Sequence, residues 1–186
     1  MESEIMRSKI VETALEILTQ TPWDALTMEE LAARLSITPI QLYTFFPTRC
    51  DLLKGIVQFI DDKMLVLYRE GKEDLSLQEK LFDIIMCRFE VMEAYKKPLK
   101  NIILTVWRDP ISFPSGIFSG LHSMNLILGA VGVPVEGLKG KLNIKILSFF
   151  YLYTLKFWFD DETQDMAKTL AHVDKGLKNI IDFLNV

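Results

Sequence analysis

The sequence predicts an all-α protein of about nine helices. Apolar residues recur at helical spacing, and short sequences that cap helix ends recur along the chain. The alternation of apolar and polar residues typical of half-buried strands does not appear, and neither do hairpin turn dipeptides. The 186 residues are enough for a small head domain joined to a larger body.

Three short helices are expected within residues 1–48, which we interpret as the head. The first helix ends near residue 22, and its apolar face consists of Ile10, Ala14, Ile17 and Leu18. Capping boxes that begin at Thr27 and Thr38 open two further helices, over about 28–35 and 39–45. Pro39 occupies the first position of the third helix, where the missing N–H costs nothing.

Residues 49–186 are expected to form a helical body. No flexible linker separates the two parts, so head and body are expected to share the long helix that begins at Arg49. A capping box at Ser76 opens the next helix, and a loop is expected over residues 109–114. The expected helices of the body cover about 49–70, 77–95, 98–107, 115–130, 138–159 and 163–184.

Composition favours a protein without metal, cofactor or disulfide. Cys50 and Cys87 match no metal-ligand or redox spacing and are interpreted as ordinary reduced thiols. The N-terminus has no apolar signal-peptide core, and the most apolar run, residues 146–159, is shorter than the roughly 20 residues of a membrane span. We therefore expect a cytoplasmic protein without a transmembrane segment.

Charge argues against strong binding to nucleic acids. The net charge of the chain is −4. Residues 1–50 hold four basic and seven acidic side chains, which gives 4 − 7 = −3 for this part. Because neutralisation of phosphates supplies much of the affinity for DNA, an acidic head is unfavourable for a DNA-binding protein.

Two short helices joined by a tight turn are nevertheless typical of a helix-turn-helix, whose second helix enters the major groove of DNA. Three runs carry a more specific signal: Leu26–Ala32, Leu35–Thr38 and Leu42–Leu53 with its Leu-Tyr-x-x-Phe-Pro-x-Arg string. These runs resemble the TetR family over about residues 7–56. The resemblance implies a homodimeric, ligand-responsive regulator, most often a repressor, that binds a double-stranded DNA operator.

The resemblance also implies roles for six side chains of the head. By position in the family, Thr27, Tyr43 and Arg49 would face phosphates, while Thr38, Gln41 and Thr44 would reach base edges. Each has a structural alternative. The two threonine caps and Gln41 would serve helix capping alone, Tyr43 would serve packing, and Arg49 would be a solvated residue of a first helical turn.

The head departs from the family pattern at the turn and in the second helix. Ser36 stands where the family usually has glycine, and a positive φ at a non-glycine residue costs roughly 1 kcal/mol. The reading helix opens with Pro39 and Ile40, where the family usually has a basic or small residue. No lysine or arginine lies between Arg34 and Arg49 to reach guanine.

The body holds more bulky apolar side chains than a minimal helical bundle requires. We predict that they line a pocket for a hydrophobic small molecule or lipid, since such pockets are lined mainly by apolar and aromatic groups. A well-filled core is the alternative. The candidate ligand-binding residues are Trp107, Phe113, Phe118, Met124, Phe149, Tyr153 and Phe157.

The last helix carries an apolar stripe with alternating spacings of four and three residues. Such a stripe is typical of helices that pack side by side, and with the apolar helix before it predicts a two-fold four-helix interface between protomers. Packing within one chain is the alternative. The candidate dimerisation residues are Trp158, Met166, Leu170, Val173, Leu177, Ile180 and Leu184.

A second, shorter resemblance concerns the C-terminal part. The run Trp158–Asp161, followed by Thr163, Thr169, Ala171 and Asp174, is similar to the accessory lipid-binding proteins of coenzyme Q biosynthesis, which have a TetR-like fold. That resemblance implies an isoprenoid-binding protein that has lost DNA binding. It is the alternative function, and it would account for the acidic head.

Catalysis is not expected. The two histidines, His122 and His172, lie on separate predicted helices, and the sequence holds no nucleophile elbow, zinc-protease motif or phosphate-binding glycine loop. We therefore predict a binding protein and no enzyme.

Overall fold

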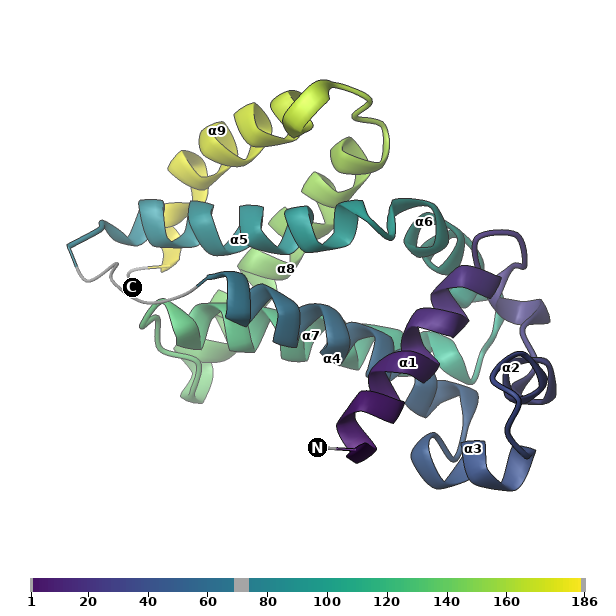
Figure 1. Cartoon of the computed structure of the whole chain (residues 1–186). Coiled ribbons are helices and arrows are strands. Elements are labelled where there is room, and N and C mark those ends of the chain that lie inside the picture. The colour runs from purple at the N-terminus through teal and green to yellow at the C-terminus, as the bar shows by residue number, and fades with distance from the viewer. Residues whose placement is uncertain (1, 69–73, 185–186) are drawn as a thin grey trace. The chain divides into compact units, whose positions relative to one another are not determined.

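The computed structural model describes residues 2–68 and 74–184 and confirms the all-α class (Figure 1). Nine α-helices and three short 3-10 turns make up its regular structure, and these described residues contain no strand. The helices are α1 (Glu2–Ile17), α2 (Met28–Arg34), α3 (Pro39–Phe45), α4 (Arg49–Leu67), α5 (Leu77–Glu93), α6 (Lys96–Thr105), α7 (Ser112–Ala130), α8 (Gly137–Phe159) and α9 (Ala167–Leu184). None of them is long and apolar enough to cross a lipid bilayer.

Two helix starts differ from the prediction by three or four residues, for local reasons. Helix α7 begins at Ser112, three residues early, because the Asp109 carboxylate accepts hydrogen bonds from Ile111 N–H and the Ser112 hydroxyl. Pro114 then falls in the first turn, where no intrahelical N–H is needed. Helix α9 begins at Ala167, four residues late, because a 3-10 turn with a positive φ at Asp165 precedes it.

The end of α4 differs in one further respect. The helix ends at Leu67, whereas the sequence predicted about residue 70. Residues 69–73, which include the last two of that predicted helix, lie outside the described residues.

The chain forms two compact units, and neither is continuous in sequence. The first holds the described residues up to Ile60 together with Met92–Ser119, and the second holds Asp61–Val91 together with the chain from Gly120 onward. The division into a head of residues 1–48 and a body of residues 49–186 concerns function and stays a prediction.

Helix α6 closes the end of α1 within the first unit. Asn101 donates hydrogen bonds of 2.9 Å to the carbonyls of Leu18 and Thr21, which have no partner inside a helix. Trp23 is fully buried, and its backbone N–H donates to the Thr105 hydroxyl at 3.0 Å. The 3-10 turn that leads into α2 is therefore held by a segment about 80 residues further along the chain.

Helices α8 and α9 pack side by side in the second unit (Figure 1). Their inner faces bury Trp158, Val173 and Leu177 completely. The ring of Phe89 from α5 stacks on Tyr151 at 5.4 Å and lies 5.6 Å from Trp158. These aromatic rings belong to the core of the second unit.

Candidate nucleic-acid interface

The turn between α2 and α3 has the geometry of a helix-turn-helix. Ser36 adopts a φ of 57°, the left-handed conformation in which the family usually has glycine. Backbone hydrogen bonds of 3.1 Å from Ser36 N–H to Ala33 and from Ile37 N–H to Ala32 close the end of α2. The predicted turn is formed, and it accepts a serine at a cost of about 1 kcal/mol.

Both helices begin at the predicted caps. The Thr27 hydroxyl accepts a hydrogen bond of 3.1 Å from Glu30 N–H. At α3 the box is complete, because the Thr38 hydroxyl accepts from Gln41 N–H at 3.2 Å and Gln41 Oε1 accepts from Thr38 N–H at 2.9 Å. Capping is thus a structural role of these three residues, and their contact with DNA stays a prediction.

The C-terminal end of helix α3 packs against α1 and α4. Phe46 is fully buried, and a Cβ atom at Gly55 of α4 would lie only 2.4 Å from its ring. The Arg7 guanidinium lies 4.5 Å from the centre of the same ring and donates to the Phe45 carbonyl at 2.8 Å. Phe46 therefore fits between α1 and α4 only because residue 55 has no side chain.

Tyr43 is exposed and bound to an acidic neighbour. Its hydroxyl donates a hydrogen bond of 3.1 Å to Glu29 of α2. This hydrogen bond and the nearby negative charge raise the pKa of Tyr43. The tyrosine therefore meets solvent next to a carboxylate, which is an unfavourable neighbour for a DNA phosphate.

Arg49 has a role that the sequence did not indicate. Its guanidinium donates to the carbonyls of Trp23, Asp24 and Leu26 at 3.1–3.3 Å and forms an ion pair of 2.7 Å with Asp109. Arg49 is therefore not a fully solvated residue. Its guanidinium N–H groups are engaged within the chain instead of being free to bind a phosphate. The side chains of Lys9 and Arg34, in contrast, are exposed.

Asp109 is the other half of this link, and it is almost fully buried. Burial by itself raises the pKa of a carboxyl group. Hydrogen bonds from the Ser112 hydroxyl, Ile111 N–H and Arg49 outweigh that effect and hold the pKa of Asp109 below its usual value. The carboxylate is therefore charged at neutral pH and joins the start of α4 to the start of α7.

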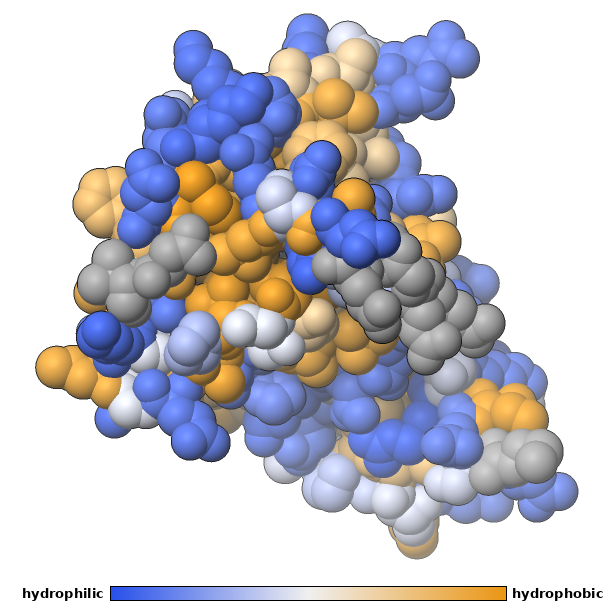
Figure 2. Space-filling model, turned by 90° about the vertical axis from the view of Figure 1, so that its left-hand side faces the viewer, coloured by the Kyte–Doolittle hydropathy of each residue, from blue (hydrophilic) through white to orange (hydrophobic). Residues whose placement is uncertain are grey.

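Six of the seven candidate ligand-binding side chains lie at the surface, and Met124 alone is buried. Trp107, Phe113 and Phe118 belong to the first unit, where Trp107 is 59% and Phe118 70% exposed. The other three, Phe149, Tyr153 and Phe157, lie on α8 of the second unit. Figure 2 shows how apolar side chains gather on one face of the molecule. All six side chains are thus exposed within one chain, and their part in ligand binding stays a prediction.

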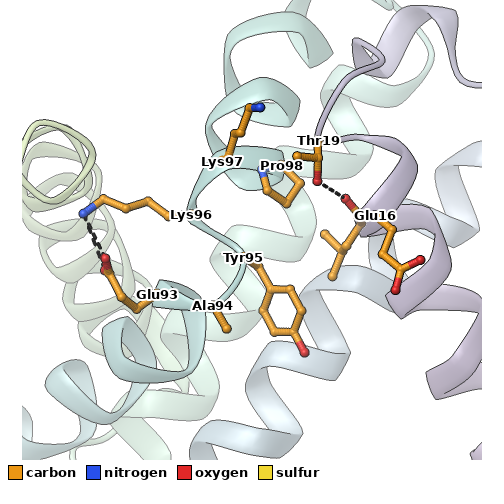
Figure 3. Close-up of a pocket in the computed structure, with 9 residues that line it drawn as sticks. Glu16, Thr19, Glu93, Ala94, Tyr95, Lys96, Lys97 and Pro98 are labelled. Carbon is orange, nitrogen blue, oxygen red and sulfur yellow. Dashed lines mark hydrogen bonds and ion pairs between the residues drawn. The ribbon is translucent and has the colours of Figure 1, made fainter.

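A pocket of about 380 Å³ lies in the first unit, between α1 and the junction of α5 and α6 (Figure 3). Its wall includes the charged side chains of Glu16, Glu93, Lys96 and Lys97, and Lys96 pairs with Glu93 at 3.2 Å. No candidate ligand-binding residue lines it. The rest of its wall is mainly apolar and includes Leu15, Tyr95 and Pro98.

The structure corrects the expected dimer interface. Val173, Leu177, Leu184 and Trp158 are at most 1% exposed and pack inside their own chain. Packing within the chain, which the sequence left open as the alternative, therefore accounts for these four. Of the remaining candidates, Met166 and Ile180 are half-buried and Leu170 is exposed.

Helix α8 instead carries an apolar stripe on its outer face, which we call the α8 stripe. It consists of Leu142, Phe149, Leu152 and Tyr153, each between 55% and 74% exposed. The spacings of seven, three and one place all four on one side of the helix. A contiguous apolar face of this kind is typical of a surface that another protein covers.

A buried polar cluster in the second unit was missed by the sequence analysis. Arg88 forms an ion pair with Asp61 and donates to the Tyr151 hydroxyl at 2.9 Å, and the Ser123 hydroxyl donates to Asp61 at 2.7 Å. All four are at most 7% exposed. The available signal in the sequence was a charged residue, such as Arg88, on an otherwise apolar helix face. A buried charge requires a partner of opposite charge, so such a residue predicts a buried ion pair.

Local structure accounts for the residues that resemble the lipid-binding proteins. Asp161 accepts hydrogen bonds from the N–H groups and hydroxyls of Thr163 and Thr169, and so closes the start of α9. Burial raises the pKa of a carboxyl group, but these four donors keep the pKa of Asp161 far below its usual value. Trp158 belongs to the core, so capping and packing explain this run without a ligand.

A comparison with known families matches the segment that contains the helix-turn-helix. Residues 10–56 match the family described as bacterial regulatory proteins, tetR family. The matched segment contains α2, α3 and the turn at Ser36.

Over these residues the chain is similar to the TetR family.

Relatives with curated descriptions match only part of this chain. One is the nucleoid occlusion factor SlmA of Idiomarina loihiensis, 25% identical over 84 residues, and another is SlmA of Shewanella frigidimarina, 29% identical over 84 residues. Each match covers 43% of this chain and 43% of the relative. The chain thus spans less than half the length of these relatives.

Solved structures show that the TetR-type fold extends over nearly the whole chain. A TetR transcriptional regulator from Nitrosomonas europaea is 22% identical, with a TM-score of 0.76 over 94% of this chain and 97% of that one. BioQ with its double-stranded DNA operator is 21% identical, with a TM-score of 0.55 over 93% and 98%. A TetR variant from Acinetobacter baumannii with minocycline is 19% identical, with a TM-score of 0.54 over 94% and 96%.

Proposed function

We propose that this protein is a homodimeric transcriptional regulator that binds duplex DNA through α2 and α3. The observation that carries the proposal is the intact turn at Ser36 between two capped helices, inside the segment that matches the TetR family. In a helix-turn-helix the second helix enters the major groove, and a dimer places two such helices about 34 Å apart. The operator would then be palindromic.

The α8 stripe supports the homodimer. Its four side chains lie at the surface of one chain, where apolar area is costly unless a partner covers it. A two-fold interface buries the same patch on both protomers, so one stripe is sufficient. The interface would thus use the outer face of α8, together with the exposed Leu170 of α9, instead of the buried stripe of α9.

Response to a small apolar molecule is the second part of the proposal. Exposed Trp107, Ile111 and Phe118 form an apolar segment close in sequence to Asp109, the partner of Arg49. A ligand that prefers one arrangement of this segment would shift the population of head conformations that fit the operator. The link between Asp109 and Arg49 provides a direct connection to the turn that precedes α2.

The ligand is tested on protein purified from cells. Native mass spectrometry is expected to reveal a bound apolar molecule, or a panel of fatty acids and isoprenoids is expected to raise the melting temperature. Protein that carries nothing and shows no thermal shift across the panel would remove the ligand from the proposal and leave the DNA-binding part intact.

The DNA-binding part is tested by selection from a random duplex library at about 50 mM salt, followed by titration of the winning duplex against salt. We expect a palindrome whose half-sites lie about one helical turn apart. We also expect a salt dependence shallower than the slope of about −10 of a strongly basic repressor, because the head is acidic. Failure to enrich any duplex would overturn the proposal.

The lipid-binding alternative receives no separate support. Within the run Trp158–Asp161 that suggested it, Trp158 packs in the core and Asp161 caps α9. We therefore do not propose it as a second function.

A further inference from the structure

Most hydrogen-bonding groups of α3 are already engaged within the chain. Gln41 Oε1 accepts from Thr38 N–H at 2.9 Å and from the Thr38 hydroxyl at 3.1 Å, which uses both of its lone pairs. The Thr44 hydroxyl donates to the Gln41 carbonyl at 2.6 Å. The Tyr43 hydroxyl donates to Glu29, as described above.

These bonds restrict which bases α3 is able to read. A glutamine recognises adenine through two bonds, in which its oxygen accepts from adenine N6 and its amide donates to N7. With Oε1 occupied, Gln41 keeps only its two N–H donors. Guanine is usually read by arginine or lysine, and α3 contains neither.

The surface that α3 does offer is apolar. Ile40 is 79% exposed, one of the most exposed large apolar side chains in the part of the chain that the structure describes. Thr44 lies four residues further along and therefore on the same face of the helix. Because its hydroxyl is turned towards the backbone of Gln41, Thr44 has its methyl group free to face outward.

We infer that α3 recognises thymine in its operator, through contact of Ile40 and the Thr44 methyl group with the C5-methyl groups of thymine in the major groove. Thymine is the only standard base with a methyl group on that edge. Contact with it removes apolar surface of both partners from water, which favours T·A pairs at those positions. This inference rests on the proposed DNA-binding function and specifies the sequence class of the DNA.

The experiment uses the duplex that the library selection enriches. Each thymine of one half-site is replaced in turn by deoxyuridine, which removes the C5-methyl group and leaves every hydrogen bond in place. We expect one or two positions at which affinity falls about threefold to fivefold, the effect of one buried methyl group. Replacement at other positions is expected to leave affinity unchanged.

Two protein variants assign the contact to Ile40. For the Ile40→Ala variant, the deoxyuridine replacement at one position is expected to leave DNA affinity unchanged, because the side chain that contacts the thymine methyl group is already absent. Val66→Ala removes another exposed apolar side chain, 59% exposed near the end of α4, and is expected to retain the full loss. Since both side chains are exposed, both variants should melt at the temperature of the wild type.

The outcomes separate this inference from the function on which it rests. If no duplex is enriched, the proposed DNA binding itself fails. If a duplex is enriched but every deoxyuridine replacement is neutral, the protein remains a DNA-binding regulator and thymine methyl recognition is wrong. A loss that persists unchanged in both Ile40→Ala and Thr44→Ser would likewise overturn it.

Discussion

Glu29 places a negative charge beside the surface that we propose meets DNA. It accepts the hydrogen bond of Tyr43, a residue that the TetR resemblance assigned to a phosphate contact. The sequence suggested the phosphate contact but not the carboxylate next to it, because the two residues lie 14 positions apart on different helices.

We therefore predict that Glu29→Gln strengthens DNA binding roughly twofold to fivefold at low salt, since one repulsive charge is removed and the amide still accepts from Tyr43. Fluorescence anisotropy on the selected duplex measures the change. Glu30→Gln is the matched control, because it removes the same charge one residue away and retains a capping-box residue. Equal gains in both variants would show that net charge alone is responsible.

The role of Asp109 also depends on a partner distant in sequence, Arg49. We predict that Asp109→Asn lowers the free energy of unfolding by roughly 1–3 kcal/mol at pH 7, because the charge that receives Arg49 is lost. The pKa of Asp109 is lowered in the folded protein, so its contribution is present above the unfolded pKa of about 3.9 and is lost as the pH falls below that value.

Urea unfolding at pH 7 and pH 3, at one protein concentration, measures this contribution. The difference between wild type and Asp109→Asn is expected to shrink at pH 3. Asp174→Asn, which breaks an exposed pair with Lys178, serves as the control and should cost less than about 1 kcal/mol. A difference that is equal at both pH values would mean that the charge of Asp109 is not what stabilises the fold.

At the scale of elements, α3 depends on the close approach of α4 at Gly55. A Cβ atom there would lie 2.4 Å from the ring of Phe46, which is enclosed on the other side by Arg7. We predict that Gly55→Ala destabilises the protein by about 1–3 kcal/mol, as expected for an overpacked core. DNA affinity should fall as well, since α3 ends at Phe45.

Gly120→Ala is the control for this prediction. It lies inside α7, and a Cβ atom there meets nothing within 4 Å. Alanine is a better helix former than glycine, so this variant should be stabilised by up to about 1 kcal/mol. Chemical unfolding that finds Gly55→Ala as stable as Gly120→Ala would show that Phe46 has room to move.

The capping boxes at Thr38 and Ser76 were predicted correctly from the sequence, and at Thr27 the structure shows the half of the box in which Glu30 N–H donates to the threonine hydroxyl. Thr38 and Gln41 satisfy each other across three residues, so the contact is determined locally and does not depend on the rest of the fold. The start of α7 was missed because its cap, Asp109, was read as part of a loop that contains two prolines.

At the scale of the whole molecule, the proposed assembly depends on the α8 stripe. We predict that a Phe149→Glu/Tyr153→Glu variant is a folded monomer, because both side chains are exposed within one chain and would bring like charges together across a two-fold axis. Sedimentation velocity measures the assembly, and circular dichroism confirms that the variant is helical.

Ile111→Glu controls for the effect of charge on an exposed apolar position, and it should remain a dimer. A dimer that persists in the α8 variant would exclude this helix from the interface. Charges at Leu177 would be uninformative, since that side chain is fully buried in its own chain and the variant would lose its fold.

The sequence alone determined the all-α class, the caps at Thr27 and Thr38 and the helix-turn-helix, because each depends on hydrogen bonds and apolar spacings that span only a few residues. Tertiary structure decided the rest. Both α8 and α9 carry apolar stripes, yet the α8 stripe faces solvent and most of the α9 stripe faces the core. Arg49 finds Asp109 sixty residues away. The packing of the helices determines which helix face is buried and which charged residues pair, and local sequence patterns do not predict this packing.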